Sequence, residues 1–266
     1  GNAQATVRNG QVDWFLSGGG WNDKKIVGNV GVTVYDGVIN ASMGASYGAS
    51  SDHTVTGNSN NIVYGGDFSG TPREGTNGFS GGITNVGSLL GNANLTIDLR
   101  NYNREFKLPS GTSISGGVPY NGTTNLGTDD SNTITLNIYT KPGSDVLNGA
   151  AIYGDGARTS SYTKSGKIIM NIQATGSSIG NLYATNYGNA PTTGLLRDVE
   201  INLQGAKTIN GLSGGNATDS FTNTIVSKNA QKVVINIGEN VDGTNNYQTE
   251  PLNATGLDRK STRLNS

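Results

Sequence analysis

The sequence has no cysteine and only one histidine, and each shortage excludes a class of site. Without cysteine the chain forms no disulfide framework, no zinc–thiolate centre and no thiol nucleophile. The single histidine, His53, leaves no second imidazole for a transition-metal site. Because His53 lies in the polar run Ser50-Ser51-Asp52-His53-Thr54, we expect its side chain to be exposed and without a partner.

Charge and long apolar runs are also scarce. Only 14% of the residues are charged and the formal net charge is -1, so the chain offers no basic surface to neutralise phosphates. We therefore expect no nucleic-acid partner. No apolar run approaches the roughly 20 residues that a bilayer-spanning helix needs, which predicts no membrane span. The low charge also argues against an intrinsically disordered chain.

Glycine is abundant, with 41 of the 266 residues, while hydrophobic residues make up only 33% and occur in short runs. This neutral, turn-rich composition is typical of many short strands joined by tight turns. No segment shows a sustained helical stripe. The composition therefore predicts an all-β fold.

The first of two recurring elements is a triplet with Asn or Asp between two aliphatic residues. The triplets are Ile97-Asp98-Leu99, Leu136-Asn137-Ile138, Met170-Asn171-Ile172, Ile201-Asn202-Leu203 and Ile235-Asn236-Ile237. Their central positions, 98, 137, 171, 202 and 236, lie 39, 34, 31 and 34 residues apart. Val32-Thr33-Val34 has the same alternation further upstream. Alternation with a period of two predicts strands that bury one face.

The second element is an apolar residue, then Ser or Tyr, then a glycine pair. Its copies are Leu16-Ser17-Gly18-Gly19, Phe79-Ser80-Gly81-Gly82, Ile114-Ser115-Gly116-Gly117 and Leu212-Ser213-Gly214-Gly215, with variants Val63-Tyr64-Gly65-Gly66 and Ile152-Tyr153-Gly154-Asp155. We expect these glycines to take positive φ where the chain turns between faces. Short third strands are expected near Ile179 and Ile209.

The two elements alternate along the chain, which favours stacked coils over a β-sandwich. Their spacing gives about 32 residues per coil and about eight irregular coils in a stack roughly 40 Å tall. The sequence therefore predicts a single-stranded parallel β-helix (β-solenoid), with longer polar stretches projecting as loops.

Acidic residues offer the only candidates for catalysis or metal binding. Asp129 and Asp130 are the only adjacent acidic pair, and a glycosidase needs two carboxylates at a defined separation. The pair weakly resembles that of polygalacturonase-like β-helices, but the accompanying histidine and basic cluster are absent, so we interpret it as a solvated turn. Asp67 and Asp155, which follow glycines, are the nearest approach to calcium ligands, and we expect such aspartates to cap their own turns. The sequence thus predicts no catalytic residue, no cofactor and no bound metal.

Tyrosines are the remaining surface candidates. Those in or near the second element are Tyr47, Tyr64, Tyr153, Tyr183 and Tyr187. Aligned along the stack, they suit either a strip that receives sugar rings or a protein, or structural ladders between coils. We favour the structural ladders.

The aliphatic-Asn-aliphatic strands together with the Ile-Tyr-Gly-Gly-like turns resemble the pectate-lyase-like adhesive regions of Gram-positive bacterial cell-surface adhesins. The resemblance covers most of residues 12 to 243 and rests on short motifs. It implies a right-handed parallel β-helix that is exported, often tethered to the cell wall, and without shared catalytic residues.

The expected function is a non-catalytic adhesive or stalk segment on the extracellular surface of a bacterium, binding a host or matrix glycan or protein. One alternative is a polysaccharide lyase or hydrolase on the same fold. The other is a passenger segment of an autotransporter. Under the leading expectation, an adhesive or stalk segment, the chain is not an enzyme.

The two ends suggest a piece of a longer protein, because the chain opens on Gly1 and shows no export signal. The last nine residues, Asp258 to Ser266, resemble a translated sequencing adapter. We therefore expect residues 1–257 to be a solenoid fragment of a larger surface protein and residues 258–266 to be a non-native tail.

Overall fold

A computed structural model defines the architecture. It describes residues 1–20, 25–48, 52–70, 78–109, 111–117, 123–126, 132–155, 166–184, 197–214, 230–238 and 253–254. Within these ranges every regular element is a β-strand, and every pair of neighbouring strands runs parallel. The predicted all-β class is confirmed. No helix in the described part is long and apolar enough to cross a membrane.

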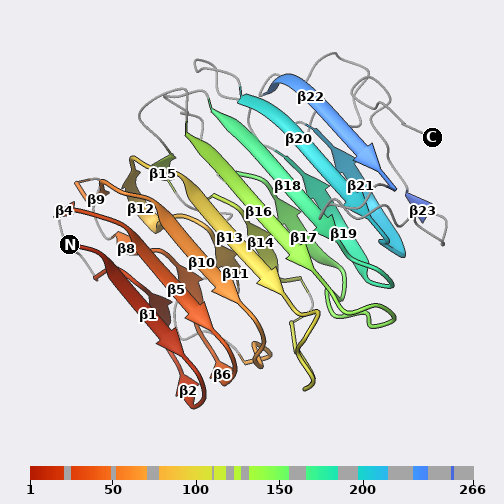
Figure 1. Ribbon diagram of the computed structural model, residues 1–266, viewed down its shortest axis with the longest axis horizontal. Coiled ribbons are helices and arrows are strands. Elements are labelled where there is room, and N and C mark those ends of the chain that lie inside the picture. Colours follow the sequence, from red (N-terminus) through yellow and green to blue (C-terminus); the bar gives the residue numbers. More distant parts are fainter. Residues whose placement is uncertain are drawn as a thin grey trace.

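Two eight-stranded sheets account for most of the strands (Figure 1). The first sheet contains, in order, β1 (Ala3–Val7), β5 (Val30–Val34), β10 (Ser59–Val63), β13 (Ala93–Asp98), β16 (Thr133–Tyr139), β18 (Lys167–Gln173), β20 (Arg197–Gln204) and β22 (Ala230–Ile237). The second contains β3 (Phe15–Ser17), β7 (Ser42–Gly44), β11 (Gly78–Ser80), β14 (Ser113–Ser115), β17 (Ala150–Tyr153), β19 (Ser178–Tyr183), β21 (Thr208–Ser213) and β23 (Asn253–Ala254). Strands of the two sheets alternate along the chain, an arrangement compatible with a β-solenoid.

A smaller third sheet is formed by strands that, along the chain, come after a second-sheet strand and before the next first-sheet strand. Its strands are β4 (Lys25–Ile26), β9 (Thr54–Val55), β12 (Thr84–Leu89) and β15 (Thr123–Leu126), and β8 (Tyr47–Gly48) also pairs with β12. β2 (Gln11–Val12) pairs with β6 (Val38–Ile39) at the turn after the first sheet. The third strands expected near Ile179 and Ile209 were wrongly placed, because both residues belong to strands of the second sheet.

Strand register confirms four of the five aliphatic triplets. Leu136 pairs with Met170, Met170 with Ile201, and Ile201 with Ile235. The triplet centred on Asp98 was wrong by two residues, because Asp98 pairs with Tyr139. The aligned segment is Leu95-Thr96-Ile97, which extends the same rows.

The second element is confirmed as one row of the second sheet. The predicted apolar residues Leu16, Phe79, Ile114, Ile152 and Leu212 lie in this row, and the structure adds Met43 and Leu182, which belong to no predicted copy. The variant Val63-Tyr64-Gly65-Gly66 was wrongly assigned, because Val63 lies in the first sheet between Val34 and Ile97.

The core lies between the sheets and is built from these inward rows. Leu95, Leu136 and Met170 are fully buried, as the period of two requires. Asn61 is the polar exception in the same row, with no exposed surface. Its Nδ2 donates to the Ser80 carbonyl at 2.7 Å and its Oδ1 accepts from the Val32 amide at 3.0 Å. Asn61 therefore joins the first sheet to the second without leaving a buried amide unpaired.

The glycines of the second element have a different cause from the one expected. A Cβ added at Gly116 would lie 2.5 Å from the carbonyl oxygen of Gly154 and 3.1 Å from the Leu136 Cβ. Gly116 is not among the described glycines with positive φ. The absence of a side chain therefore permits close approach of neighbouring backbones and is not required by a left-handed turn.

A row of asparagines stands just before the first-sheet strands. The Oδ1 of Asn2 accepts a hydrogen bond from the backbone amide of Asn29 at 2.9 Å. In the same way, Asn29 Oδ1 accepts from the Asn58 amide and Asn58 Oδ1 accepts from the Asn92 amide, both at 2.8 Å. Asn92 then accepts from the amide of Thr133 at 2.8 Å. Each side chain thus satisfies a backbone donor of the next strand along the stack.

Candidate binding surface

The outward side chains of the first sheet form straight rows because the strands are in register. In one row, Asn137 Nδ2 donates to Thr96 Oγ1 at 3.1 Å, and Asn171 Nδ2 donates to Asn137 Oδ1 at 2.9 Å. Asn202 donates to Asn171 at 2.9 Å, and Asn236 donates to Asn202 at 2.7 Å. These five residues, here called the amide row, are all partly exposed.

The amide row retains hydrogen-bonding capacity after its internal bonds are made. A carboxamide has two N–H donors, and each bond along the row uses one. The second N–H of Asn202 reaches Glu200 Oε1 at 3.2 Å, while Lys167 Nζ donates to Glu200 Oε2 at 2.7 Å. The Lys167 bond, followed by the Asn202 bond, lowers the pKa of Glu200. The row is thus a regular array of neutral donors and acceptors with one ion pair beside it.

A second row, here called the tyrosine edge, lies at the C-terminal ends of the same strands, which the arrowheads mark in Figure 1. Its successive members are Arg8, Tyr35, Tyr64, Asp98 and Tyr139, each next to or at the end of its strand. The Arg8 guanidinium lies 4.5 Å from the centre of the Tyr35 ring. The Tyr35 and Tyr64 rings stack at 5.2 Å with an interplanar angle of 21°. Tyr35 and Tyr64 are 39% and 37% exposed, so both side chains are accessible to solvent.

Further along the tyrosine edge, Asp98 and Tyr139 are joined through Arg100. The Arg100 Nε and NH2 groups donate to the two carboxylate oxygens of Asp98 at 2.9 and 2.7 Å. The same guanidinium lies 4.4 Å from the Tyr139 ring centre. This hydrogen bonding from Arg100 lowers the pKa of Asp98. Each of the two guanidinium groups thus lies over an aromatic ring of the edge.

Asp36 anchors the turn behind the tyrosine edge. Its Oδ1 accepts from the Gly37 amide at 2.9 Å and from the Tyr102 hydroxyl at 2.8 Å, and Arg104 forms an ion pair with Oδ2. The Tyr102 hydrogen bond is the main reason that the pKa of Asp36 is lowered. The turn is thus held by an ionised carboxylate.

The structure places the predicted tyrosines in different environments. Tyr153 and Tyr183 are buried, at 3% and 4% exposure, and their ring centres lie 6.2 Å apart. The structural-ladder prediction is confirmed for this pair. Tyr64 instead belongs to the tyrosine edge, Tyr47 is partly buried at the start of β8, and Tyr187 lies outside the described residues.

Arg8 and Tyr35 were not predicted from the sequence. The signal that identifies them is their position directly after Val7 and Val34, which matches that of Tyr64 after Val63.

The prediction that the His53 side chain is exposed and without a partner is wrong. The side chain is 1% exposed, and its Nε2 lies 2.9 Å from the hydroxyl of Ser46. That hydroxyl also donates to the Gly20 carbonyl at 3.1 Å. β9 begins at Thr54, directly after His53, and carries the chain into the third sheet.

The candidate acids fall into three situations. Asp67 accepts from the Ser69 amide and hydroxyl at 2.9 and 2.5 Å, which confirms the prediction that it caps its own turn. Asp155 is buried, at 1% exposure. Asp129 and Asp130 lie outside the described residues. Across the described ranges, no group of three or more His, Cys, Asp or Glu side chains is arranged to hold a metal ion.

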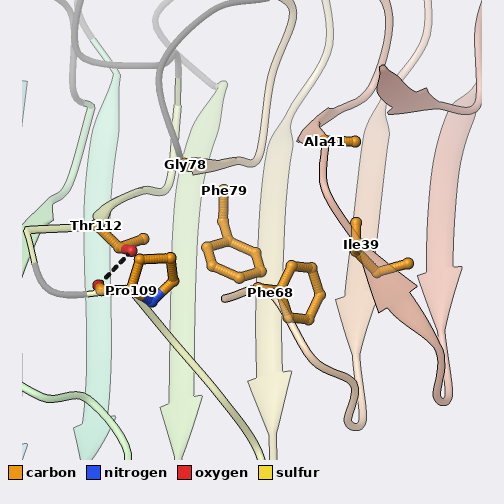
Figure 2. A pocket seen from close by; sticks show the side chains of 7 residues that line it. All are labelled: Ile39, Ala41, Phe68, Gly78, Phe79, Pro109 and Thr112. Atoms are coloured by element: carbon orange, nitrogen blue, oxygen red, sulfur yellow. Dashed lines mark hydrogen bonds between the residues drawn. The ribbon is translucent and has the colours of Figure 1, made fainter. Parts of the chain in front are cut away.

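An apolar crevice lies between β6, which contributes Ile39, and the second-sheet strand β11, which contributes Phe79 (Figure 2). The tilted rings of Phe68 and Phe79 lie next to each other in its lining, with centres 4.6 Å apart, and Pro109 and Thr112 lie on the other side of Phe79. The Thr112 hydroxyl donates to the Pro109 carbonyl at 2.7 Å. The crevice has room for about one water molecule, so it is a packing defect and too small for a sugar ring.

The candidate site is therefore an extended surface. A scan against protein-family models and searches of curated proteins and of solved structures find no match to this chain.

Proposed function

We propose that this chain is a section of a right-handed parallel β-solenoid of about eight coils from a bacterial cell-surface adhesin. It acts as a non-catalytic adhesive or stalk segment, exposed outside the cell. Its ligand is a glycan chain that lies along the outer face of the first sheet.

The strand order supports the solenoid. Each first-sheet strand is followed in the chain by a second-sheet strand, and both sheets extend through eight strands. A parallel crossover between strands of one sheet is right-handed in about 98% of cases. Such a stack gives length and stiffness, which suit an adhesive segment or a spacer.

The single observation that carries the glycan proposal is the amide row. Asn171 and Asn202 belong to a series that repeats at each strand, and the strands stand about 4.8 Å apart. A polysaccharide presents hydroxyl groups at regular intervals, so one chain aligned with the stack meets an amide at successive strands. Neutral carboxamides donate to and accept from hydroxyls without a large desolvation penalty. Many weak contacts along one chain then add to a useful affinity.

The test is a binding screen of the full chain against glycan and matrix-protein arrays, with each hit incubated and assayed for cleavage. Glycan binding without cleavage is the expected result. Cleavage of any polysaccharide would overturn the non-catalytic assignment, and binding of proteins alone would overturn the glycan assignment.

A paired variant locates the binding face. Asn171→Thr with Asn202→Thr removes two amides, and Thr already occupies this row at Thr96 and suits a strand. We expect about thirtyfold weaker binding, because the two lost hydrogen bonds contribute about 1 kcal/mol each. Gln4→Thr is the matched control on β1, at the far end of the same sheet, and should bind normally. Equal affinities in both variants would show that the amide row is not the site.

A further inference from the structure

The turn after β1 places a reactive pair, Asn9 and Gly10, on the surface. Both residues are exposed, and Gly10 has φ of 103°. The Gly10 amide donates to the side-chain Oδ1 of its own neighbour Asn9 at 2.8 Å. No atom lies within 4 Å of a Cβ built at Gly10, so the space beside this peptide bond is open.

This geometry brings a backbone nitrogen against the carbonyl group of the preceding side chain. We propose that Asn9 is a self-modification site, at which the chain converts its own asparagine to aspartate and isoaspartate through a cyclic imide. The Gly10 nitrogen loses its proton and bonds to Asn9 Cγ, the Cγ–Nδ2 bond breaks, and ammonia leaves with that proton. Water then adds to either carbonyl of the five-membered ring, opening it to one of the two products.

The turn one strand further along the stack is an internal comparison. The Gly37 amide donates to Asp36 Oδ1 at 2.9 Å, and φ of Gly37 is 125°, so the local arrangement repeats that of Asn9 and Gly10. Asp36, however, is ionised and held by Tyr102 and Arg104, and a carboxylate is a poor electrophile. A Cβ at Gly37 would also lie 2.8 Å from the Gly10 carbonyl oxygen, so this peptide is crowded. The same reaction is therefore suppressed there.

The other Asn-Gly pairs in the described ranges are restrained. Asn148 is exposed, but the Gly149 amide donates to the Ser178 carbonyl at 2.9 Å, which occupies the nitrogen that would attack. The Asn210-Gly211 pair lies within β21, where Gly211 pairs with Asn181. Asn9 is thus distinguished by its backbone geometry, since these pairs share the same Asn-Gly dipeptide.

Conversion alters the tyrosine edge. It adds a negative charge directly after Arg8, whose guanidinium covers the Tyr35 ring. Isoaspartate also lengthens the backbone by one carbon at the turn, where the Gly10 carbonyl accepts from the Val38 amide at 2.8 Å. The product therefore differs from the original chain in both charge and local pairing.

The experiment compares Asn9 with Asn148 by peptide mapping and mass spectrometry after the full chain ages in mildly alkaline buffer. The native protein and the urea-unfolded protein are aged in parallel. In the unfolded chain both asparagines should react at similar rates. In the native chain Asn148 should slow by at least about tenfold, while Asn9 keeps its unfolded rate.

An Asn9→Gln variant is the control, because a six-membered imide forms slowly. It should show no product at position 9 and unchanged behaviour at Asn148. If folding slowed Asn9 as much as Asn148, the native turn would protect the residue and the proposal would be wrong.

Discussion

Substituting Gly116 by alanine tests whether neighbouring backbones of the second sheet approach as closely as the structure shows. The added Cβ would lie 2.5 Å from the Gly154 carbonyl oxygen. A carbon and a carbonyl oxygen ordinarily stand about 3.3 Å apart, so the overlap is about 0.8 Å. Ile134 Cγ2 and Leu136 Cβ, both 3.1 Å away, close the other directions.

The overlap is costly because the obstructing atom belongs to the backbone. The Gly154 carbonyl shares its peptide group with the Asp155 amide, which donates to the Ala184 carbonyl at 3.1 Å, so rotating it away would strain that bond. We therefore assign about 3 kcal/mol to the strain. Replacing glycine also restricts the unfolded chain, which returns about 0.5 kcal/mol. We expect Gly116→Ala to lower the free energy of unfolding by about 2.5 kcal/mol.

Urea denaturation followed by circular dichroism measures this difference. Gly143→Ala is the control, because φ of Gly143 is 82° and no atom lies within 4 Å of an added Cβ. Its cost is the left-handed backbone alone, about 1 kcal/mol. A Gly116→Ala protein as stable as the original would refute the close approach.

Two further predictions concern the tyrosines and the tyrosine edge. Tyr183→Ala should cost about 3 kcal/mol of unfolding free energy, because the side chain is buried, whereas Tyr64→Ala, at a partly exposed ring, should cost about 1 kcal/mol; equal losses in urea denaturation would contradict the two environments. Hydrogen bonding from Arg100 lowers the folded-state pKa of Asp98 below the ordinary 3.8, so its stabilising effect is present above that value and disappears as the pH falls through the folded pKa. Asp98→Asn should therefore reduce stability at neutral pH and make little difference in strong acid, and a constant difference across the pH series would exclude this origin.

The aliphatic rows were predictable from sequence, but their register was not always so. Leu136, Met170, Ile201 and Ile235 each sit beside an asparagine, and this shared neighbour fixed their alignment. Asp98 misled because the segment from Leu95 to Leu99 alternates throughout, and such a strand allows a slip of two residues without changing its buried face.

Other parts of the fold and the site escaped the sequence for physical reasons. Strands of two residues, such as β4 and β9, are too short to show a period. His53 is buried by the third sheet, which its polar neighbours give no sign of. The asparagines before the strands had a usable signal, the dipeptide Gly-Asn at residues 1–2, 28–29, 57–58 and 91–92. The amides were identified as strand centres, yet their mutual hydrogen bonds depend on register.

Because equivalent positions recur one strand apart, the protein can lose or gain a whole repeat unit without changing how neighbouring strands pair. Asn137 and Asn171 are 34 residues apart and occupy the same place in the amide row. Deleting residues 137 to 170 would join Leu136 directly to Asn171. Leu136 would keep its aliphatic neighbour in the core, and Asn171 would take the place of Asn137 beside Thr96 on the outer face. A gene that duplicates or deletes one such unit therefore changes the reach of the protein by about 4.8 Å without inventing a new interface.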